Sequence, residues 1–227
     1  MSKIKYDGYE LEYFDSAYNF RKYQLELIKD YLSNDLAEVG PGRGEFVNYY
    51  QKYLRSIKLI EPDKNLFNIL KKKHKKKNIK IENTTIDKVK NKFQTIIYFD
   101  VLEHIKYDLK EVHEAKKKLK KNGLLIFSVP AYQIFYNEFD KSVGHFKRYN
   151  KDDFRKISLK TKLKIEKMFY YDSFGLFLLM INKLFNLSNK NLKNNIKIWN
   201  FLIPLSKFID VITFNKFGKS LLCILRK

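Results

Sequence analysis

The sequence predicts a fold of the α/β class: a seven-stranded, mostly parallel sheet with helices on both faces and an apolar helical insertion before the last strand. One observation behind this prediction is that short apolar runs alternate along the chain with amphipathic stretches of helical periodicity. Another is that the apolar runs are nearly continuous, as from Leu124 to Val129, where only Ser128 is polar. Such strands are buried on both faces, which is typical of a parallel sheet between two layers of helices.

The first half of the chain supplies four of the expected strands. Between them, apolar side chains recur at helical spacing, for example at Phe46, Val47, Tyr50 and Leu54. The elements expected here are one or two helices within 13–31, strands at 35–39, 57–60, 79–81 and 95–99, and helices at 45–54 and 65–73. This alternation of strand and helix favours a parallel sheet.

The second half supplies the remaining three strands. A helix at 109–120 should end at Asn122-Gly123, a favourable C-terminal stop. Asn150 is a good N-cap, with Asp153 three residues later, for a helix that runs to about Leu159. The strands expected here are 124–129, 163–170 and 220–225.

Residues 172–217 differ in character from the rest of the chain. They hold two apolar stretches, 174–181 and 196–214, and Pro204 interrupts the second. The first is too short to span a bilayer, which needs about 20 apolar residues. We therefore expect a core formed by 1–171 and 218–227, and a helical insertion that packs on this core, on a second subunit of a homodimer or on a membrane surface.

Composition limits the class of protein. A chain of 227 residues that is 44% hydrophobic can form one domain with a full core. The single cysteine, Cys223, excludes an internal disulfide and a multi-cysteine zinc site, so we expect organic chemistry and no metal site. The start of the chain has no apolar signal segment, which predicts a cytoplasmic location.

The formal net charge of +21 points to an anionic partner, either a nucleic acid or a membrane surface. The basic residues are nearly all Lys, a solvated point charge, whereas specific phosphate recognition favours the forked donors of Arg. A solvated Lys-rich surface is therefore the simpler interpretation. Peripheral association with an anionic membrane, at its inner face, stays open, and nucleic acid is the less favoured partner.

A glycine loop, Glu38-Val39-Gly40-Pro41-Gly42-Arg43-Gly44, follows the first expected strand and opens a helix. Glycines let the backbone approach a ligand, and a helix N-terminus presents free N–H groups. The spacing Gly-x-Gly-x-Gly differs from the Gly-x-Gly-x-x-Gly of nicotinamide sites. The acid before the glycines would repel a pyrophosphate and attract a cationic ligand.

Two further segments place acids at the carboxyl ends of strands, where open α/β sheets bind ligands. Glu61 ends the second strand, about 20 residues after the glycine loop, where such sites hold a ribose; a surface Glu in a loop is the alternative. The fourth strand runs into Asp100-Val101-Leu102-Glu103-His104.

These three segments, in this order, resemble the class I S-adenosylmethionine-dependent methyltransferases, which have a Rossmann-like fold. The resemblance covers roughly residues 13–171, and the glycine loop and Leu102-Glu103-His104 are its most specific parts. It implies S-adenosylmethionine as the cofactor. The residues that it places around this cofactor are Glu38, Gly40, Pro41 and Gly42 at the methionine part, with Gly44 in the same loop, Glu61 at the ribose, Pro62 and Asp63 beside the adenine, and Asp100 and Val101 near the ammonium and sulfonium groups. For the adenine amino group, either Asp87 supplies the acid, or Thr85 substitutes for it and Ile86 packs on the ring.

A closer likeness follows the fifth strand, in Val129-Pro130-Ala131-Tyr132 and Gly144-His145-Phe146-Lys147-Arg148-Tyr149. This is similar to a bacterial branch of the family with a Gly-His-x-Arg-Arg-Tyr motif, often associated with surface-polysaccharide and glycosyl-transfer gene sets. Lys147 replaces the first Arg of that motif. The final segment, 218–227, also looks like the last strand of that branch.

Methyl transfer from a sulfonium is an in-line displacement, which the enzyme promotes mainly by alignment. A base near a hydroxyl acceptor helps, and His is the usual choice near neutral pH. His104 and His145 are the candidates, with Arg148 and Tyr149 beside them. Alternatively, His104 only orients its loop, and the second cluster is a structural lock onto Asp140. His74 and His113 lie in Lys-rich helical stretches, where we expect them to be solvated.

The resulting hypothesis is a cytoplasmic methyltransferase that acts on a hydroxyl or carboxyl of a small, sugar-like or lipid-linked acceptor. A nucleic-acid methyltransferase is an alternative, but no Asn/Asp-Pro-Pro-aromatic motif follows the fourth strand and no separate basic module is present. A non-catalytic cofactor-binding scaffold is another. A nicotinamide-dependent oxidoreductase is disfavoured by the glycine spacing.

Overall fold

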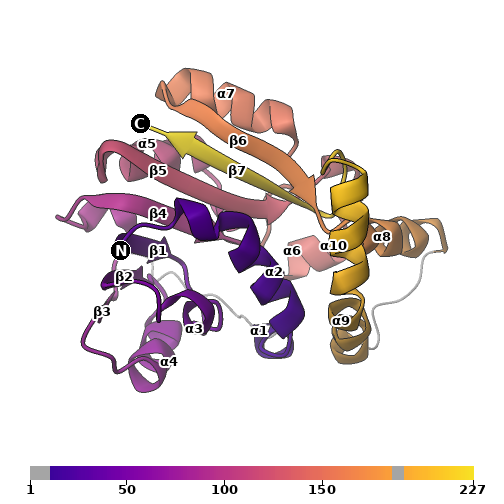
Figure 1. Cartoon of the computed structure of the whole chain (residues 1–227), viewed down its shortest axis with the longest axis horizontal. Helices are drawn as coiled ribbons and strands as arrows, with labels where there is room; N and C mark the ends of the chain where they lie inside the picture. Colours follow the sequence, from indigo (N-terminus) through magenta and orange to yellow (C-terminus); the bar gives the residue numbers. More distant parts are fainter. Residues whose placement is uncertain (1–10, 186–191) are drawn as a thin grey trace.

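A seven-stranded sheet forms the centre of the computed structural model, which describes residues 11–185 and 192–227 (Figure 1). The strand order is β3-β2-β1-β4-β5-β7-β6. Strands β1 to β5 pair in parallel, and β7 runs antiparallel to both β5 and β6. The strands are β1 (Asp35–Val39), β2 (Ser56–Ile60), β3 (Ile79–Glu82), β4 (Phe93–Phe99), β5 (Leu119–Pro130), β6 (Lys164–Tyr171) and β7 (Ser220–Arg226). The predicted seven-stranded, mostly parallel sheet is confirmed.

Helices cover both faces of this sheet (Figure 1). Side chains of α2, α3 and α4 pack in the core layer on one face, and those of α5 and α7 pack in the layer on the other. The α-helices are α1 (Leu11–Phe14), α2 (Tyr18–Ile28), α3 (Val47–Tyr50), α4 (Lys64–Lys73), α5 (Asp108–Lys117), α6 (Glu138–Ser142), α7 (Lys151–Thr161), α8 (Ser173–Phe185), α9 (Leu192–Phe201) and α10 (Ile203–Ile212).

Strand β4 shows why the apolar runs are continuous. Ile97 and Phe99 belong to the core layer beneath α2 and α3, whereas Ile96 and Tyr98 belong to the layer beneath α5 and α7. Successive side chains of a strand point to opposite faces, so a strand buried on both faces needs apolar residues at every position.

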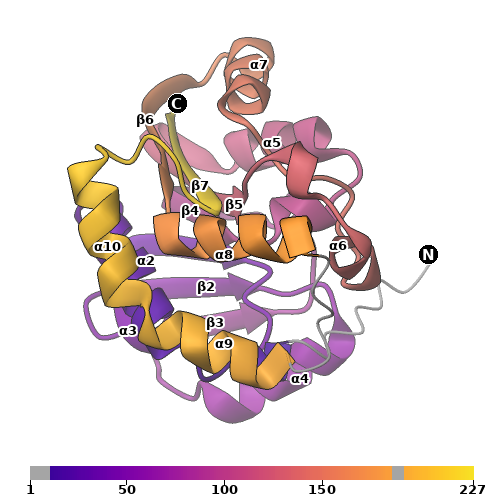
Figure 2. The ribbon, with the colours of Figure 1, turned by 90° about the vertical axis from the view of Figure 1, so that its right-hand side faces the viewer.

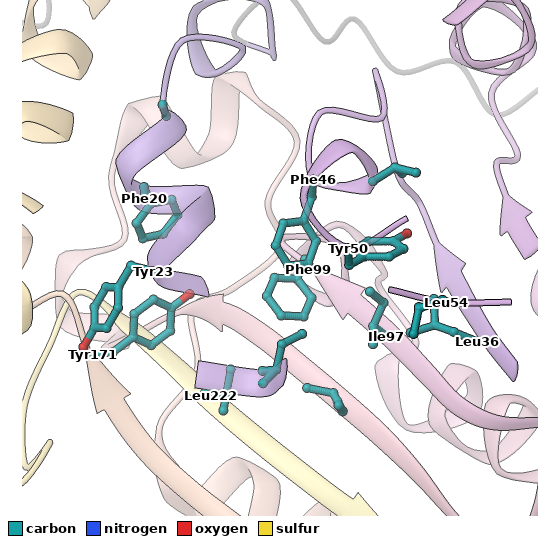
Figure 3. Packing of buried hydrophobic residues seen from close by; sticks show 14 of the residues in the cluster. Phe20, Tyr23, Leu36, Phe46, Tyr50, Leu54, Ile97, Phe99, Tyr171 and Leu222 are labelled. Atoms are coloured by element: carbon teal, nitrogen blue, oxygen red, sulfur yellow. The ribbon is translucent and has the colours of Figure 1, made fainter. Parts of the chain in front are cut away.

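Aromatic rings fill the first of these layers (Figure 3). The Phe20 ring of α2 stacks on Tyr171 of β6, with centroids 5.9 Å apart. The Phe46 ring stacks on Phe99 at the end of β4, with centroids 4.7 Å apart. These contacts hold the N-terminal helices against the carboxyl end of the sheet.

The helical segment before the last strand lies at that same end (Figures 1 and 2). Two buried aspartates attach it to the core. Asp210 of α10 accepts hydrogen bonds from the Tyr23 hydroxyl (2.7 Å) and from the backbone N–H groups of Asp172 (2.7 Å) and Ser173 (2.9 Å). Asp172 in turn accepts one from the Trp199 indole at 2.8 Å. No helix in the described parts of the chain is long and apolar enough to cross a membrane.

Two predicted helices are longer than the helices in the structure. The helix expected at 45–54 is regular only at Val47–Tyr50, because no side chain caps its N-terminus and Asn and Tyr are weak helix formers. The helix expected at 109–120 ends at Lys117. Leu119 instead pairs with Phe93 of β4 and is almost fully buried there, so strand pairing prevails over the helical pattern.

Candidate functional site

The glycine loop leaves β1 at the carboxyl edge of the sheet with left-handed backbone at Gly40, Gly42 and Gly44, whose φ angles are 64°, 57° and 79°. This conformation favours glycine over any other residue. A Cβ atom on Gly40 would lie 2.8 Å from the Val101 Cγ2, so the close approach of the loop to the end of β4 also requires glycine. The loop is therefore shaped to present its backbone to a ligand.

The carboxylate of Glu61 joins the glycine loop to the end of β2. It accepts hydrogen bonds from the backbone N–H groups of Gly42 at 3.1 Å and Asp63 at 2.9 Å. Glu61 is only 3% exposed, and burial raises the pKa of its carboxyl to about 7 even though these two donors act in the opposite direction. Each oxygen keeps a lone pair for a further donor such as a ribose hydroxyl.

Neighbours of Glu61 shape the loop beyond β2. Asp63 is the N-cap of α4 and accepts hydrogen bonds from the backbone N–H groups of Asn65 (2.8 Å) and Leu66 (2.9 Å). The Asn83 amide, after β3, donates to the carbonyl groups of Glu61 (2.8 Å) and Pro62 (3.0 Å). Asn83 was not singled out by the sequence analysis, because its role depends on the pairing of β3 with β2.

In the loop after β3, the polar residues Thr85 and Asp87 flank the apolar residue Ile86. The Thr85 hydroxyl donates to the Asp87 carboxylate at 2.5 Å, and this bond holds the pKa of Asp87 below its usual value. Ile86 is fully buried in the core between them. Its side chain therefore supports the loop from beneath, and Thr85 and Asp87 are the groups that face outward.

Glu38, at the end of β1, is a second buried acid beside the glycine loop. The Tyr50 hydroxyl donates a short hydrogen bond to it. Burial raises the pKa of Glu38 to about 7, and the hydrogen bond from Tyr50 and the charge of Arg21 partly offset this. Glu38 lines a pocket at this edge together with Arg21, Gly40, Pro41, Phe46 and Phe99.

Arg21 of α2 is a charged pocket residue that the sequence analysis missed. Its Nη1 donates to Asp100 at 3.2 Å and to the Gln24 side chain at 2.7 Å. Its buried Nε has no hydrogen-bond partner among the described residues, so it can still donate to a ligand. The available signal was an Arg in a helix of a chain whose basic residues are nearly all Lys.

Further side chains hold the glycine loop in place. Arg43 donates to Asp15 at 2.9 Å and to Glu12 at 3.1 Å, which ties the loop to the α1 region. The prediction that His74 is solvated is wrong: it is 6% exposed, and its Nε2 lies 3.1 Å from the Gly44 carbonyl oxygen. The cause is that α4 ends at Lys73 and the chain then turns His74 back toward the loop.

A second cluster lies where β4 ends. Asp100 adopts a left-handed φ of 56°, and the short turn Leu102–His104 follows it. The structure brings His104 and His145 together, with ring centroids 4.5 Å apart in an edge-to-face arrangement. Burial, with a smaller effect of His145, lowers the pKa of His104 to about 3, so the ring is neutral near pH 7. Glu103 is almost fully buried, and burial followed by the charge of Asp100 raises its pKa well above the usual value.

Asp140 organises the loop that carries His145. Its fully buried carboxylate accepts hydrogen bonds from His145 Nδ1 at 2.8 Å and from Arg148 Nε at 3.0 Å. Tyr149 is fully buried, and its hydroxyl donates to the Leu102 carbonyl and to the Asp108 carboxylate, each at 3.1 Å. His145 and Arg148 thus share one buried acid, whereas Tyr149 attaches the same loop to the segment after β4.

Comparisons with known proteins bear on this geometry. A family model described as a methyltransferase domain matches residues 14–177. Solved structures with a similar fold include a S-adenosylmethionine-dependent methyltransferase from Archaeoglobus fulgidus (15% identity, TM-score 0.64, covering 96% of this chain and 98% of that one). Two others were solved with bound S-adenosylhomocysteine. One is the N-methyltransferase NodS from Bradyrhizobium japonicum (12% identity, TM-score 0.58, covering 93% of this chain and 88% of that one). The other is the magnesium protoporphyrin IX methyltransferase ChlM from Synechocystis (10% identity, TM-score 0.59, covering 96% of this chain and 84% of that one). A comparison with curated proteins gives no match.

The raised pKa values of Glu38 and Glu61 predict a pH-dependent stability. Between the unfolded value of 4.5 and about 7, the unfolded chain releases a proton that each folded acid retains, so stability falls as pH rises through this window. Glu38→Gln removes the contribution of Glu38 to this loss of stability. Relative to wild type, this variant should gain roughly 3 kcal/mol between pH 4.5 and 7.5, measured by urea unfolding.

The matched control is Glu166→Gln on β6, at an exposed carboxylate that lies 2.8 Å from the guanidinium of Arg226 on β7. The pKa of Glu166 is lowered by this hydrogen bond, so its replacement should give no gain with rising pH. A difference between Glu38→Gln and wild type that stays constant across the range would show that the pKa of Glu38 is the same in the folded and the unfolded protein.

Proposed function

The chain belongs to the methyltransferase-domain family and is an S-adenosylmethionine-dependent methyltransferase, and from this premise we propose that it methylates a hydroxyl or carboxyl of a small, sugar-like or lipid-linked acceptor. The observation that carries the proposal is the pair of imidazoles, His104 and His145, that lies directly after β4 beside the cofactor segment Asp100–Val101. The likeness of 144–149 to the Gly-His-x-Arg-Arg-Tyr branch supports a role in surface-polysaccharide biosynthesis.

The donor groups of the pocket fit the cofactor. S-adenosylmethionine has a carboxylate, an ammonium, a sulfonium and two ribose hydroxyls, and when bound it supplies an electrophilic methyl group. Arg21 Nε, which lacks a partner in the described structure, would donate to the carboxylate. Glu38 and Asp100 would attract the two cationic groups. Glu61 would accept hydrogen bonds from the ribose hydroxyls through its remaining lone pairs.

The adenine end is assigned to the loops after β2 and β3. Pro62 lies beside the capping residue Asp63, which keeps the start of α4 fixed. Thr85 and Asp87 face outward from the neighbouring loop, and the Asp87 carboxylate would accept a hydrogen bond from the adenine amino group.

At the end of the glycine loop, His74 contacts the carbonyl oxygen of Gly44. This contact would keep the backbone of the loop close to the ligand.

His104 and His145 are the groups that we place next to the acceptor. Each imidazole can accept a hydrogen bond from a hydroxyl and so orient its oxygen toward the methyl group. We assign positioning roles to Arg148 and Tyr149, because both are buried and their polar atoms bind Asp140, Leu102 and Asp108. The two imidazoles therefore lie beside the acceptor, and Asp140 holds His145 in place.

Calorimetric titration with S-adenosylmethionine tests the cofactor assignment. Wild type should bind with a stoichiometry of about one per chain. Glu61→Gln keeps the shape of the side chain but removes its charge, so it should weaken binding by about 10- to 100-fold, the effect of losing one or two hydrogen bonds to a charged acceptor. The control Glu166→Gln, at a carboxylate on β6 that pairs with Arg226 of β7, should bind like wild type. Absence of binding by folded wild-type protein would refute the assignment, and binding without turnover on any acceptor would favour the scaffold alternative.

A lipid-linked acceptor is supported by the exposed apolar residues of α9 and α10. Leu205, Phe208 and Ile212 are spaced three and four residues apart, so they share one face of α10, and they are 43%, 63% and 58% exposed. Phe201, at the end of α9, is 77% exposed. Aromatic and aliphatic side chains on a strongly basic protein are suited to the surface of an anionic membrane. We therefore propose that 172–217 is an insertion that contacts the inner face of the membrane.

Sedimentation with anionic liposomes at low salt tests this membrane contact. The wild-type protein should pellet with the vesicles, and the double substitution Phe201→Ser with Phe208→Ser should weaken binding by at least about 10-fold, because each buried Phe contributes about 1.5–3 kcal/mol. The control is Leu159→Ser on α7, a side chain that is 78% exposed and lies outside this segment. Equal recovery of wild type in the supernatant with and without anionic lipid would contradict the proposal.

A further inference from the structure

Three potential metal ligands converge at the end of β4. Glu103 and His104 come from the turn Leu102–His104, and His145 comes from the loop after α6. One ligand atom from each of the three side chains lies within 4.8 Å of the other two. A ligand pair on opposite sides of a zinc ion would be at most about 4.4 Å apart, since each bond is about 2.0–2.2 Å long. Small side-chain rotations would therefore bring all three atoms onto one ion.

One oxygen of the buried Glu103 carboxylate lacks a hydrogen-bond donor among the described residues. The residue is 1% exposed, and its Oε2 atom has no hydrogen-bond partner within the described chain. A buried carboxylate oxygen without a donor is costly, because it has lost water and gained nothing in exchange. A cation at this position would supply the missing interaction.

The Asp140–His145 pair has the arrangement that supports a metal-ligating histidine. A carboxylate can only accept, so His145 Nδ1 donates its proton to Asp140 across 2.8 Å, and Nε2 carries the lone pair. Metal-binding histidines commonly donate their second nitrogen to a carboxylate in this way, which fixes the tautomer and the ring orientation. Arg148 also binds Asp140, which fixes that carboxylate in turn.

We propose that Glu103, His104 and His145 bind a divalent transition-metal ion, with water or an acceptor oxygen completing its coordination. Two imidazoles and one carboxylate suit zinc, cobalt, nickel, iron or manganese, whereas magnesium and calcium prefer sites made of oxygen ligands. The expectation of no metal site rested on the single cysteine, and this cluster contains none. Glu103 and His104 are adjacent in the sequence, and the loop after α6 brings His145 to them.

The proposed metal site does not depend on the proposed function, but the role of the ion in methyl transfer rests on that function. A divalent cation beside the acceptor lowers the pKa of a hydroxyl that binds to it. The acceptor hydroxyl would lose its proton to solvent, its oxygen would bond to the methyl carbon, and the carbon–sulfur bond would break with its electron pair staying on sulfur. The two histidines would then hold the ion instead of taking the proton.

The test uses the tag-free full chain, stripped with a chelator and titrated with Co²⁺, whose visible d–d absorption reports coordination by protein ligands. Calorimetric titration with Zn²⁺ gives the affinity. One equivalent should bind, and Glu103→Gln and His145→Gln should each weaken binding by at least about 10-fold, because even the loss of an outer hydrogen-bond partner costs about 10- to 100-fold. His113→Gln, on α5, is the control and should bind like wild type.

Each variant is also titrated with S-adenosylmethionine, which separates loss of the metal site from loss of the fold. Normal cofactor binding with weakened metal binding supports the site, and cofactor failure with intact Co²⁺ binding would refute the proposed function alone. The metal proposal is overturned if wild type shows no saturable Co²⁺ spectrum, or if folded Glu103→Gln and His145→Gln bind Co²⁺ as tightly as wild type.

Discussion

The hydrogen bonds that the buried Glu61 carboxylate accepts from the backbone of Gly42 and Asp63 are the constraint on which the proposed cofactor site depends. They join the ends of two neighbouring parallel strands, whose register pairs Val39 with Ile60. On its other side, β1 pairs with β4, with Val39 opposite Tyr98. Three strands therefore end at one level, and the groups that follow them face the same space.

Buried charge is the second common feature of this edge of the sheet. Glu38 and Glu61 are buried carboxylates whose pKa values are raised to about 7, so the free protein keeps them at a cost that a cationic or hydroxyl-bearing ligand would offset. Where we propose that the acceptor binds, the fully buried Asp140 carboxylate accepts hydrogen bonds from His145 and Arg148. In both places a buried acid fixes a loop, and the loop presents the groups that face the ligand.

The sequence predicted the parts of this arrangement that depend on local pattern. Strands buried on both faces, the glycine loop and the acids at strand ends could all be identified because each follows from residues close together in the chain. Arg21, Asn83 and the burial of His74 could not, since their partners Asp100, Glu61 and Gly44 are brought near by strand pairing and helix packing. The over-long helix at 109–120 has the same origin, because Leu119 pairs with Phe93.

The most direct test of the proposed cofactor site is a crystal structure of the protein with bound S-adenosylhomocysteine, the product of methyl transfer. We expect both ribose hydroxyls to lie within about 3.2 Å of the Glu61 carboxylate oxygens, and the ligand carboxylate to receive a hydrogen bond from Arg21. A ligand that binds elsewhere, or that binds at this edge without touching Glu61, would contradict the proposed site.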